Sequence, residues 1–304
     1  MKPDLARFTQ WMRFPPDVDM LGRTVRAKGE GTIKQYLYTA GRYAEFLAGR
    51  DMSTETTREW IDGLTGNSAR SKAHHIEALK ALFFAHDMRL GLGKPKFTES
   101  LPRVLSEDEL TRLIADARER TRSTDIGAYG LERAAWRYVL VMVFFGSGVR
   151  KDEGRKLRVE DVVRDGNEGT IHVREGKGGD DRYIAVEGEV VDAVDDWLAI
   201  RRIKSPWIFA GRDASKPASR HPIEVGLTQA CRYVGIRDFH VHMARHSYAT
   251  ALARGDADAE AIRVQLGHKS VTTTQKYLHL TLSERRGHLP SVVGTTRPKQ
   301  LKEK

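Results

Sequence analysis

The chain has 304 residues, and its 51 lysines and arginines against 41 acidic residues give a net charge of +10. Hydrophobic residues make up 40% of the chain, and no apolar run is long enough to span a bilayer. The single cysteine, Cys231, excludes an internal disulfide and a cysteine-rich zinc site, so we expect an intracellular, cytoplasmic protein. The positive charge favours a polyanionic partner, because long-range attraction and counterion release both stabilise such complexes.

The N-terminal third predicts an all-helical domain over residues 31–92, preceded by an extension over residues 1–30. Thr32 is a candidate cap for the first helix, and Ser53 and Ser68 precede the next two. The charged faces of these helices suit either a DNA-clamping module or ordinary solvated surfaces. The basic residues expected on the exterior are Arg23, Arg26, Lys28, Lys34, Arg42, Arg70, Lys72 and Lys80.

A Gly- and Pro-containing segment without hydrophobic periodicity predicts a linker over residues 93–104. Ser106 and Glu109 then have the spacing of a capping box, which predicts a new helix. We expect a second domain over residues 105–290. A basic tail follows over residues 291–304.

The second domain predicts mainly helices with a small β-sheet. A long apolar helix is expected over residues 131–147, and two short strands over 170–174 and 182–186 flank a glycine-rich turn. Residues 207–209 are a candidate for a further strand. Additional helices are expected over residues 190–200, 221–234, 242–254 and 258–266.

Arg150 follows the apolar helix at Gly146-Ser-Gly148, where a tight turn holds it at the edge of the core. A guanidinium group suits a phosphate because its donors form a planar fork. An ordinary ion pair between Arg150 and Glu153 or Glu160 is the alternative interpretation of an arginine at this position.

His242 and Arg245 lie three residues apart and therefore share one face of a predicted helix. Near the start of the helix, both side chains can bind one anion together with backbone N–H groups. A capping histidine beside a surface arginine is the alternative. The neighbouring histidines also permit a zinc site in principle, but no carboxylate or cysteine spacing supports one.

Three further residues are weak signals when each is taken alone. Lys177 lies in the glycine-rich turn, where it is a candidate general acid or a solvated lysine. His268 follows Leu266-Gly267, where glycine typically ends a helix. Tyr277 is a nucleophile only if a base or nearby cations activate it, and is otherwise a half-buried packing residue.

The joint pattern resembles the tyrosine recombinase, or phage-type integrase, family and most closely its Xer-like branch. The resemblance covers residues 30–285. The matching strings are Leu101-Pro-Arg-Val-Leu-Ser-Glu-Asp-Glu-Leu110, Phe145-Gly-Ser-Gly-Val-Arg-Lys-Asp-Glu153, Gly176-Lys-Gly-Gly-Asp-Asp-Arg182, His242-Met-Ala-Arg-His-Ser-Tyr-Ala-Thr250 and Leu266-Gly-His-Lys-Ser-Val-Thr-Thr-Thr-Gln-Lys-Tyr-Leu-His279. The sequence departs from the family pattern at Val241, Ala244, Asp152 and Gly154, none of which is a catalytic position.

The resemblance implies a helical core-binding domain joined to a mixed α/β catalytic domain, and a site-specific recombinase that needs neither metal nor cofactor. Tyr277 would attack a DNA phosphodiester and form a 3′-phosphotyrosyl link. Arg150 and Arg245 would hold the phosphate oxygens, and Glu153 would support Arg150. The remaining implied roles are Lys177 as general acid, His242 as the base for Tyr277 and His268 as a phosphate ligand.

The resemblance also implies the partners. These are double-stranded DNA, a homo-tetramer on paired DNA sites, and accessory DNA-bending or host proteins, with no membrane and a nucleoid-associated location. Two alternatives share the fold: a type IB topoisomerase-like relaxing enzyme, and a catalytically silent DNA-binding accessory protein.

Overall fold

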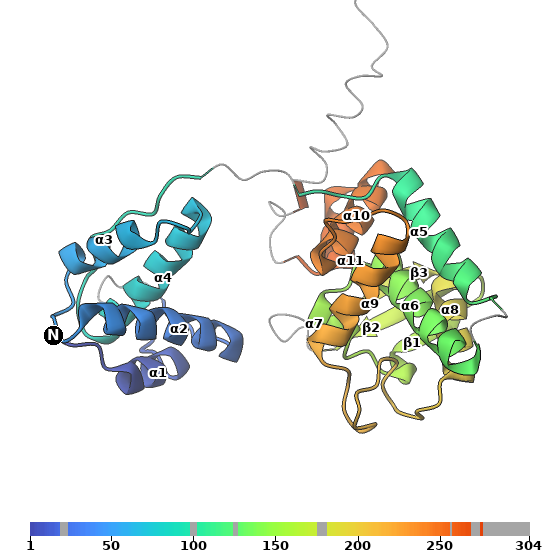
Figure 1. Cartoon of the computed structure of the whole chain (residues 1–304), viewed down its shortest axis with the longest axis horizontal. Coiled ribbons are helices and arrows are strands. Elements are labelled where there is room, and N and C mark those ends of the chain that lie inside the picture. Colours follow the sequence, from blue (N-terminus) through green and yellow to red (C-terminus); the bar gives the residue numbers. More distant parts are fainter. Residues whose placement is uncertain are drawn as a thin grey trace, which may run out of the picture. The chain divides into compact units, whose positions relative to one another are not determined.

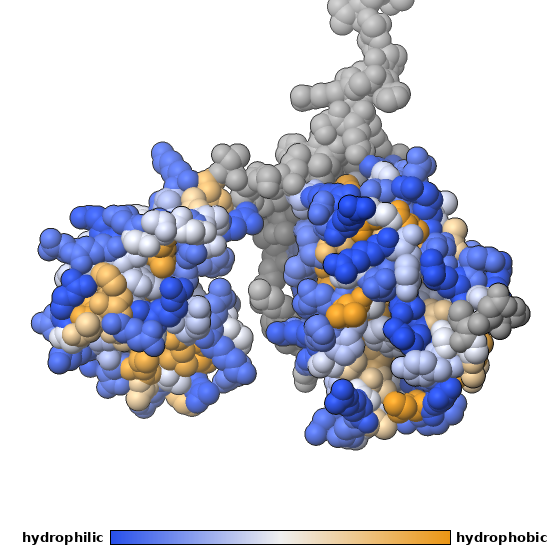
Figure 2. All heavy atoms as spheres, in the orientation of Figure 1, coloured by the Kyte–Doolittle hydropathy of each residue, from blue (hydrophilic) through white to orange (hydrophobic). Residues whose placement is uncertain are grey.

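The computed structural model describes residues 1–18, 24–97, 102–123, 127–174, 181–255, 257–268 and 274–275 (Figure 1). The chain divides into two compact units, Met1–Ser100 and Leu101–Lys304. Each has its own hydrophobic core. In the view of Figure 2 the surface of both units is mainly hydrophilic, with small hydrophobic patches between charged side chains.

The first unit is helical throughout its described part. Its helices are α1 (Leu5–Arg13), α2 (Glu30–Leu47), α3 (Thr54–Gly63) and α4 (Ala69–Ala85). Ser53 and Ser68 cap α3 and α4 as expected, each accepting a backbone N–H with its side chain. The expectation of a cap at Thr32 is wrong, because α2 begins earlier and Gly29 occupies the N-cap position.

Helix α1 lies within the segment expected to be an N-terminal extension. Phe8 and Met12 on this helix are fully buried and belong to the same core as Tyr43 and Leu79. His86, after α4, holds the start of α1, because its ring Nε2 accepts the backbone N–H of Asp4 at 2.8 Å. Helix α1 is therefore an integral part of the first unit.

The second unit is built around α6 (Gly127–Ser147), an apolar helix whose C-terminal half is buried. Helices α5 (Glu107–Arg120), α8 (Gly188–Ile200), α9 (Arg220–Tyr233) and α10 (Val241–Arg254) pack against it. Ser106 forms the expected capping box with Glu109 at the start of α5. Two short helices, α7 (Lys151–Gly154) and α11 (Ala259–Leu266), complete the α-helices of the described part, which also contains a short 3-10 helix, η1 (Val159–Asp161).

An antiparallel sheet in the order β1-β2-β3 covers part of this core (Figure 1). The strands are β1 (Val162–Asp165), β2 (Glu168–Val173) and β3 (Arg182–Glu187), and His172 pairs with Tyr183 across β2 and β3. The prediction of a mainly helical protein with a small sheet is confirmed. Strand β1 was not predicted, and residues 207–209 contribute only an isolated bridge between Arg158 and Trp207 rather than a strand.

Candidate active site

The C-terminal end of α6 leads directly to Arg150 through a turn at Gly148. Gly148 has φ +61, and a Cβ added there would lie 2.5 Å from the Tyr248 ring. Only glycine tolerates both the left-handed conformation and this close approach. The buried helix and the turn therefore fix the point at which Arg150 leaves the core.

Arg150 is held by a carboxylate and by a backbone carbonyl. Its Nη1 donates to Oε1 of Glu153 at 2.6 Å, and its backbone N–H donates to Oε2 of the same residue at 2.8 Å. Its Nη2 donates to the carbonyl oxygen of Gly267 at 2.9 Å. The ion pair expected with Glu153 is thus present, and it orients the guanidinium without excluding a role at a phosphate.

Arg245 is buried on α10 and meets the same two segments. Its Nη1 donates to the carbonyl oxygen of Gly148 at 2.8 Å, and its Nη2 donates to that of Leu266 at 2.6 Å. Arg150 and Arg245 therefore bind consecutive carbonyl groups, Leu266 and Gly267, at the end of α11. Residues more than ninety positions apart in the sequence are brought together in this way.

His268 follows these carbonyls and is also buried. Its Nδ1 hydrogen-bonds Oγ1 of Thr274 at 2.9 Å. Burial lowers the pKa of His268 to about 4, and the positive charges of Arg245 and Arg150 act in the same direction. The imidazole is neutral at pH 7, so it has one N–H to donate and one nitrogen that accepts.

His242 lies in the first turn of α10, and its side chain is exposed. Partial burial of its ring lowers the pKa of His242 below its ordinary value, and the nearby charges of His240 and Arg245 lower it further. A neutral imidazole at this position retains a lone pair that can accept a proton.

Glu153 is the acidic centre of the cluster. Burial raises its pKa, but hydrogen bonds and positive charge from Arg182 and Arg150 outweigh burial and lower the pKa to about 2. Glu153 therefore stays ionised. Three guanidinium groups, those of Arg150, Arg182 and Arg245, surround this carboxylate and its neighbouring carbonyls, so the cluster has an excess of positive charge.

The structure brings together Arg150, Glu153, Arg245 and His268 among the predicted residues. Arg245 also links them to α10, which carries His242. Lys177 and Tyr277 lie outside the described residues. Their place at this cluster stays a prediction.

Arg182 is part of one of the matching motifs, but the sequence analysis assigned no role to it. The sequence pattern that could have identified it is the alternation of side chains along β3, which puts Arg182 on the same face as Ile184 and Val186. Those two residues are buried, so a charged residue at the third position of the face requires a partner there.

The described residues also bear on a metal site and on a membrane-spanning helix. The described part of the chain contains no group of three or more histidine, cysteine, aspartate or glutamate side chains that could hold a metal ion. The histidines of α10 adjoin positive charges rather than carboxylates, which disfavours the zinc alternative. Within the described residues no helix is long and apolar enough to cross a membrane.

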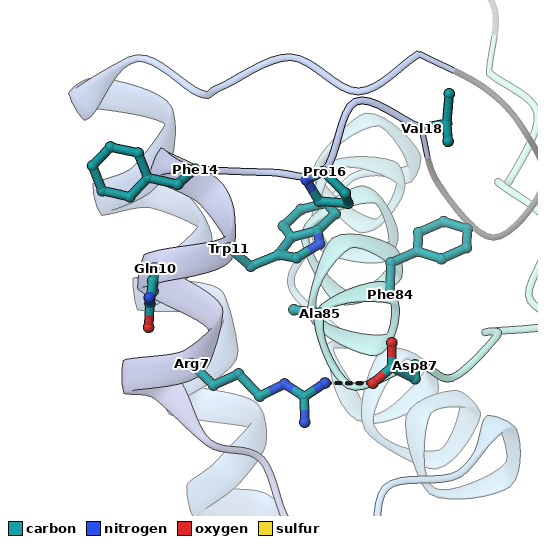
Figure 3. A pocket seen from close by; sticks show the side chains of 9 residues that line it. All are labelled: Arg7, Gln10, Trp11, Phe14, Pro16, Val18, Phe84, Ala85 and Asp87. Carbon is teal, nitrogen blue, oxygen red and sulfur yellow. Dashed lines mark hydrogen bonds and ion pairs between the residues drawn. The ribbon is translucent and has the colours of Figure 1, made fainter.

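The first unit contains a pocket of about 480 Å³ between α1 and the end of α4 (Figure 3). Trp11, Phe14 and Phe84 line it, and an ion pair between Arg7 and Asp87 closes one side. It contains none of the predicted catalytic residues. The arginine cluster of the second unit is the candidate active site.

Residues 103–284 match the phage integrase family. Tyrosine recombinase XerA of Thermococcus kodakarensis is 29% identical over 86% of this chain and 89% of its own length. Tyrosine recombinase XerC of Pseudomonas aeruginosa is 31% identical over 82% of this chain and 80% of its own length.

Solved structures give the same result. A XerA recombinase is 27% identical and covers 94% of this chain and 98% of its own, with a TM-score of 0.51. XerH site-specific recombinase bound to its difH substrate has a TM-score of 0.70 at 19% identity, covering 92% and 95% of the two chains. A lambda integrase tetramer on a Holliday junction has a TM-score of 0.64 at 16% identity, covering 90% and 75%. The last two show a shared fold.

The family match and the recombinase relatives show that the protein is a tyrosine recombinase, and the chain belongs to the phage integrase family. Its relatives place it on the Xer-like branch of that family.

Proposed function

We propose that the protein cuts and rejoins double-stranded DNA at specific sites through a 3′-phosphotyrosyl intermediate. One observation carries the proposal: Arg150 and Arg245 converge on the consecutive carbonyls of Leu266 and Gly267. Two guanidinium groups held side by side can bind the two non-bridging oxygens of one phosphodiester. They then offset the charge that develops in the transition state.

The remaining steps follow from the chemistry of the individual groups. Tyr277 attacks the phosphorus and displaces a 5′-hydroxyl, and a 5′-hydroxyl of another duplex later reverses the step. Each exchange replaces one phosphate ester by another, so no external energy source is required. Lys177 protonates the leaving oxygen, and neutral His242 accepts the proton of Tyr277. His268 donates its one N–H to a phosphate oxygen in the tautomer in which Nδ1 accepts the hydroxyl proton of Thr274, and Glu153 orients Arg150.

The first unit serves as a DNA-binding module in this proposal. Arg26, Lys34, Arg42 and Arg70 are exposed on it, as a phosphate-binding surface requires. The proposed core-binding domain comprises α1 in addition to the predicted residues 31–92, and the proposed catalytic domain covers residues 105–290. By analogy with the tetrameric and DNA-bound relatives, four copies act on paired sites.

The test uses a nicked suicide substrate, whose released strand cannot return and which therefore traps the covalent complex. Because the target sequence differs between relatives, the substrate comes from DNA recovered covalently on the protein in cells. The wild-type protein forms an adduct that survives denaturation and disappears after proteolysis. Tyr277→Phe forms none. An adduct with Tyr277→Phe contradicts the assignment and directs attention to Tyr183, Tyr233 and Tyr248.

The relaxing-enzyme alternative predicts a different product from the same chemistry. A plasmid with two target sites separates them, because a recombinase exchanges the flanking segments. Relaxation of any plasmid without exchange would favour the topoisomerase-like activity. A silent accessory protein would bind DNA and form no adduct. The recombinase relatives favour exchange over relaxation, and the assembled arginine cluster favours a catalytic protein over a silent one.

A further inference from the structure

Arg182 is a mostly buried arginine that the proposed mechanism leaves without a role. It begins β3, and only 10% of its side chain is exposed. It lies on the inner face of the strand with Ile184 and Val186. Burying a charge at such a position costs free energy unless a partner compensates.

The partner is Glu153, and the geometry is a fork on a carboxylate. Arg182 Nη1 donates to Oε1 at 3.1 Å, and Nη2 donates to Oε2 at 2.7 Å. Glu153 also accepts the backbone N–H and Nη1 of Arg150. These hydrogen bonds occupy both oxygens of the carboxylate twice, and two arginines therefore share one acid.

Arg182 also packs against the second group that holds Arg150. A Cβ added at Gly267 would lie 2.8 Å from Cδ of Arg182 and 2.9 Å from its Nε. Gly267 has φ +65 and offers its carbonyl oxygen to Arg150. Arg182 thus touches both partners of Arg150, the carboxylate of Glu153 and the backbone of Gly267.

The hydrogen bonding of Arg182 is incomplete. Its Nε is buried, and within the described residues it has no hydrogen-bond partner. An unpaired buried N–H costs free energy, because the group has lost its hydrogen bond to water. Arg201 has the same unpaired Nε, so the role of Arg182 is inferred from its fork on Glu153 and its contact with Gly267.

The charge balance explains what Arg182 contributes. Glu153 alone would neutralise Arg150 and weaken its attraction for a phosphate. With Arg182 present, two positive charges face one negative charge, and the group retains a net charge of +1. The fork also holds the carboxylate still, so that Arg150 is presented in one orientation.

We propose that Arg182 is a positioning residue for phosphate activation. It fixes and neutralises Glu153, so that Arg150 keeps its orientation and net charge, and it ties β3 to the end of α11. It makes no contact with the phosphate. The inference rests on the proposed function.

The experiment compares Arg182→Gln with Arg182→Lys and with a matched control, Arg201→Gln. Arg201 is a second buried arginine with an unpaired Nε, but its terminal nitrogens donate to the carbonyl groups of Trp207 and Ser205. Each variant is assayed for single-turnover cleavage of the suicide substrate, DNA affinity and thermal unfolding. Arg201→Gln measures the general cost of removing a buried arginine.

We expect Arg182→Gln to cleave about 100-fold more slowly than wild type, because a small misplacement of a phosphate ligand has that effect. DNA affinity changes little. Arg182→Lys recovers part of the rate because it restores the charge beside Glu153. Arg201→Gln lowers the unfolding temperature and leaves the cleavage rate of the folded protein unchanged.

The pH profile distinguishes positioning from general destabilisation. Loss of Arg182 removes the hydrogen bonds and charge that lower the pKa of Glu153, so this pKa rises. The cleavage rate of Arg182→Gln relative to wild type therefore falls further as the pH is lowered into the ordinary titration range of glutamate, about pH 5 to about pH 4. The ratio for Arg201→Gln stays flat.

Two results overturn the inference while leaving the proposed function intact. In one, wild type forms the adduct and Arg182→Gln cleaves within about twofold of it. In the other, Arg182→Gln and Arg201→Gln show the same rate loss and the same pH profile. Failure of wild type itself to form an adduct contradicts the proposed function instead.

Discussion

Arg245 donates to the carbonyl oxygen of Gly148 at 2.8 Å, and this hydrogen bond joins α10 to the turn that precedes Arg150. One arginine thereby fixes the backbone from which the other arginine of the site extends. Tyr248, which is also on α10, lies against the same turn at Gly148.

Gly148→Ala is expected to lower both stability and cleavage. Alanine at positive φ costs about 1 kcal/mol or more, and its Cβ would collide with the ring of Tyr248. Gly235→Ala is the matched control, since Gly235 has φ +84 but nothing within 4 Å of an added Cβ. Thermal unfolding and suicide-substrate cleavage compare the two. Equal losses in both variants would show that the contact with Tyr248 has no importance.

Arg150→Lys is expected to keep DNA binding and to lose cleavage by about 100-fold or more, as when one oxyanion donor is removed. Lysine retains the charge but cannot donate to Glu153 and Gly267 while presenting a fork to phosphate. Single-turnover cleavage and a gel-shift assay measure the two quantities. A near-normal cleavage rate would remove Arg150 from the catalytic group.

Much of the fold was accessible from local sequence signals, because caps and periodicity act over a few residues. Ser53, Ser68 and Ser106 each begin a helix as predicted. Strand β1 was missed because its exposed residues show no alternation, so its pairing with β2 decides its conformation. The cap at Thr32 failed because α2 begins at Glu30, two residues earlier.

The candidate site was predicted only in part, for a related reason. Motif spacing identified Arg150 and Arg245, but it could not show that both donate to consecutive carbonyls at the end of α11. That arrangement depends on tertiary packing. The role proposed for Arg182 could not be predicted from motif spacing either, because it depends on contact with Glu153, which lies 29 residues away in the sequence.

The stability of the second unit is expected to fall between about pH 6.5 and about pH 4.5, above the range in which carboxylates titrate. Burial lowers the pKa of His246 and of His268 to about 4, and neighbouring positive charges lower both further. At pH values below the ordinary histidine pKa, His246 and His268 bind protons in the unfolded chain but remain neutral in the folded chain. Protonation therefore favours unfolding as the pH falls.

Unfolding temperatures measured across this range test the prediction, with His246→Gln as the variant. Removing one such histidine reduces the proton uptake on unfolding by about one proton near pH 5, so the pH slope becomes shallower. Parallel curves for the variant and the wild type would mean that His246 titrates normally in the folded protein.

Cys231 is expected to be chemically silent in the folded protein. Its side chain is fully buried on α9, and burial raises the pKa of its thiol to about 12, with the charge of Glu109 acting in the same direction. The thiolate is the reactive form, so almost none is present at neutral pH. A thiol-reactive dye should label the native chain slowly and the denatured chain at once.

Because Cys231 is the single cysteine of the chain, the labelling rate reports the opening of the core around α9. Rapid labelling of native protein under conditions where the unfolding temperature is unchanged would contradict the buried placement of α9 against α6.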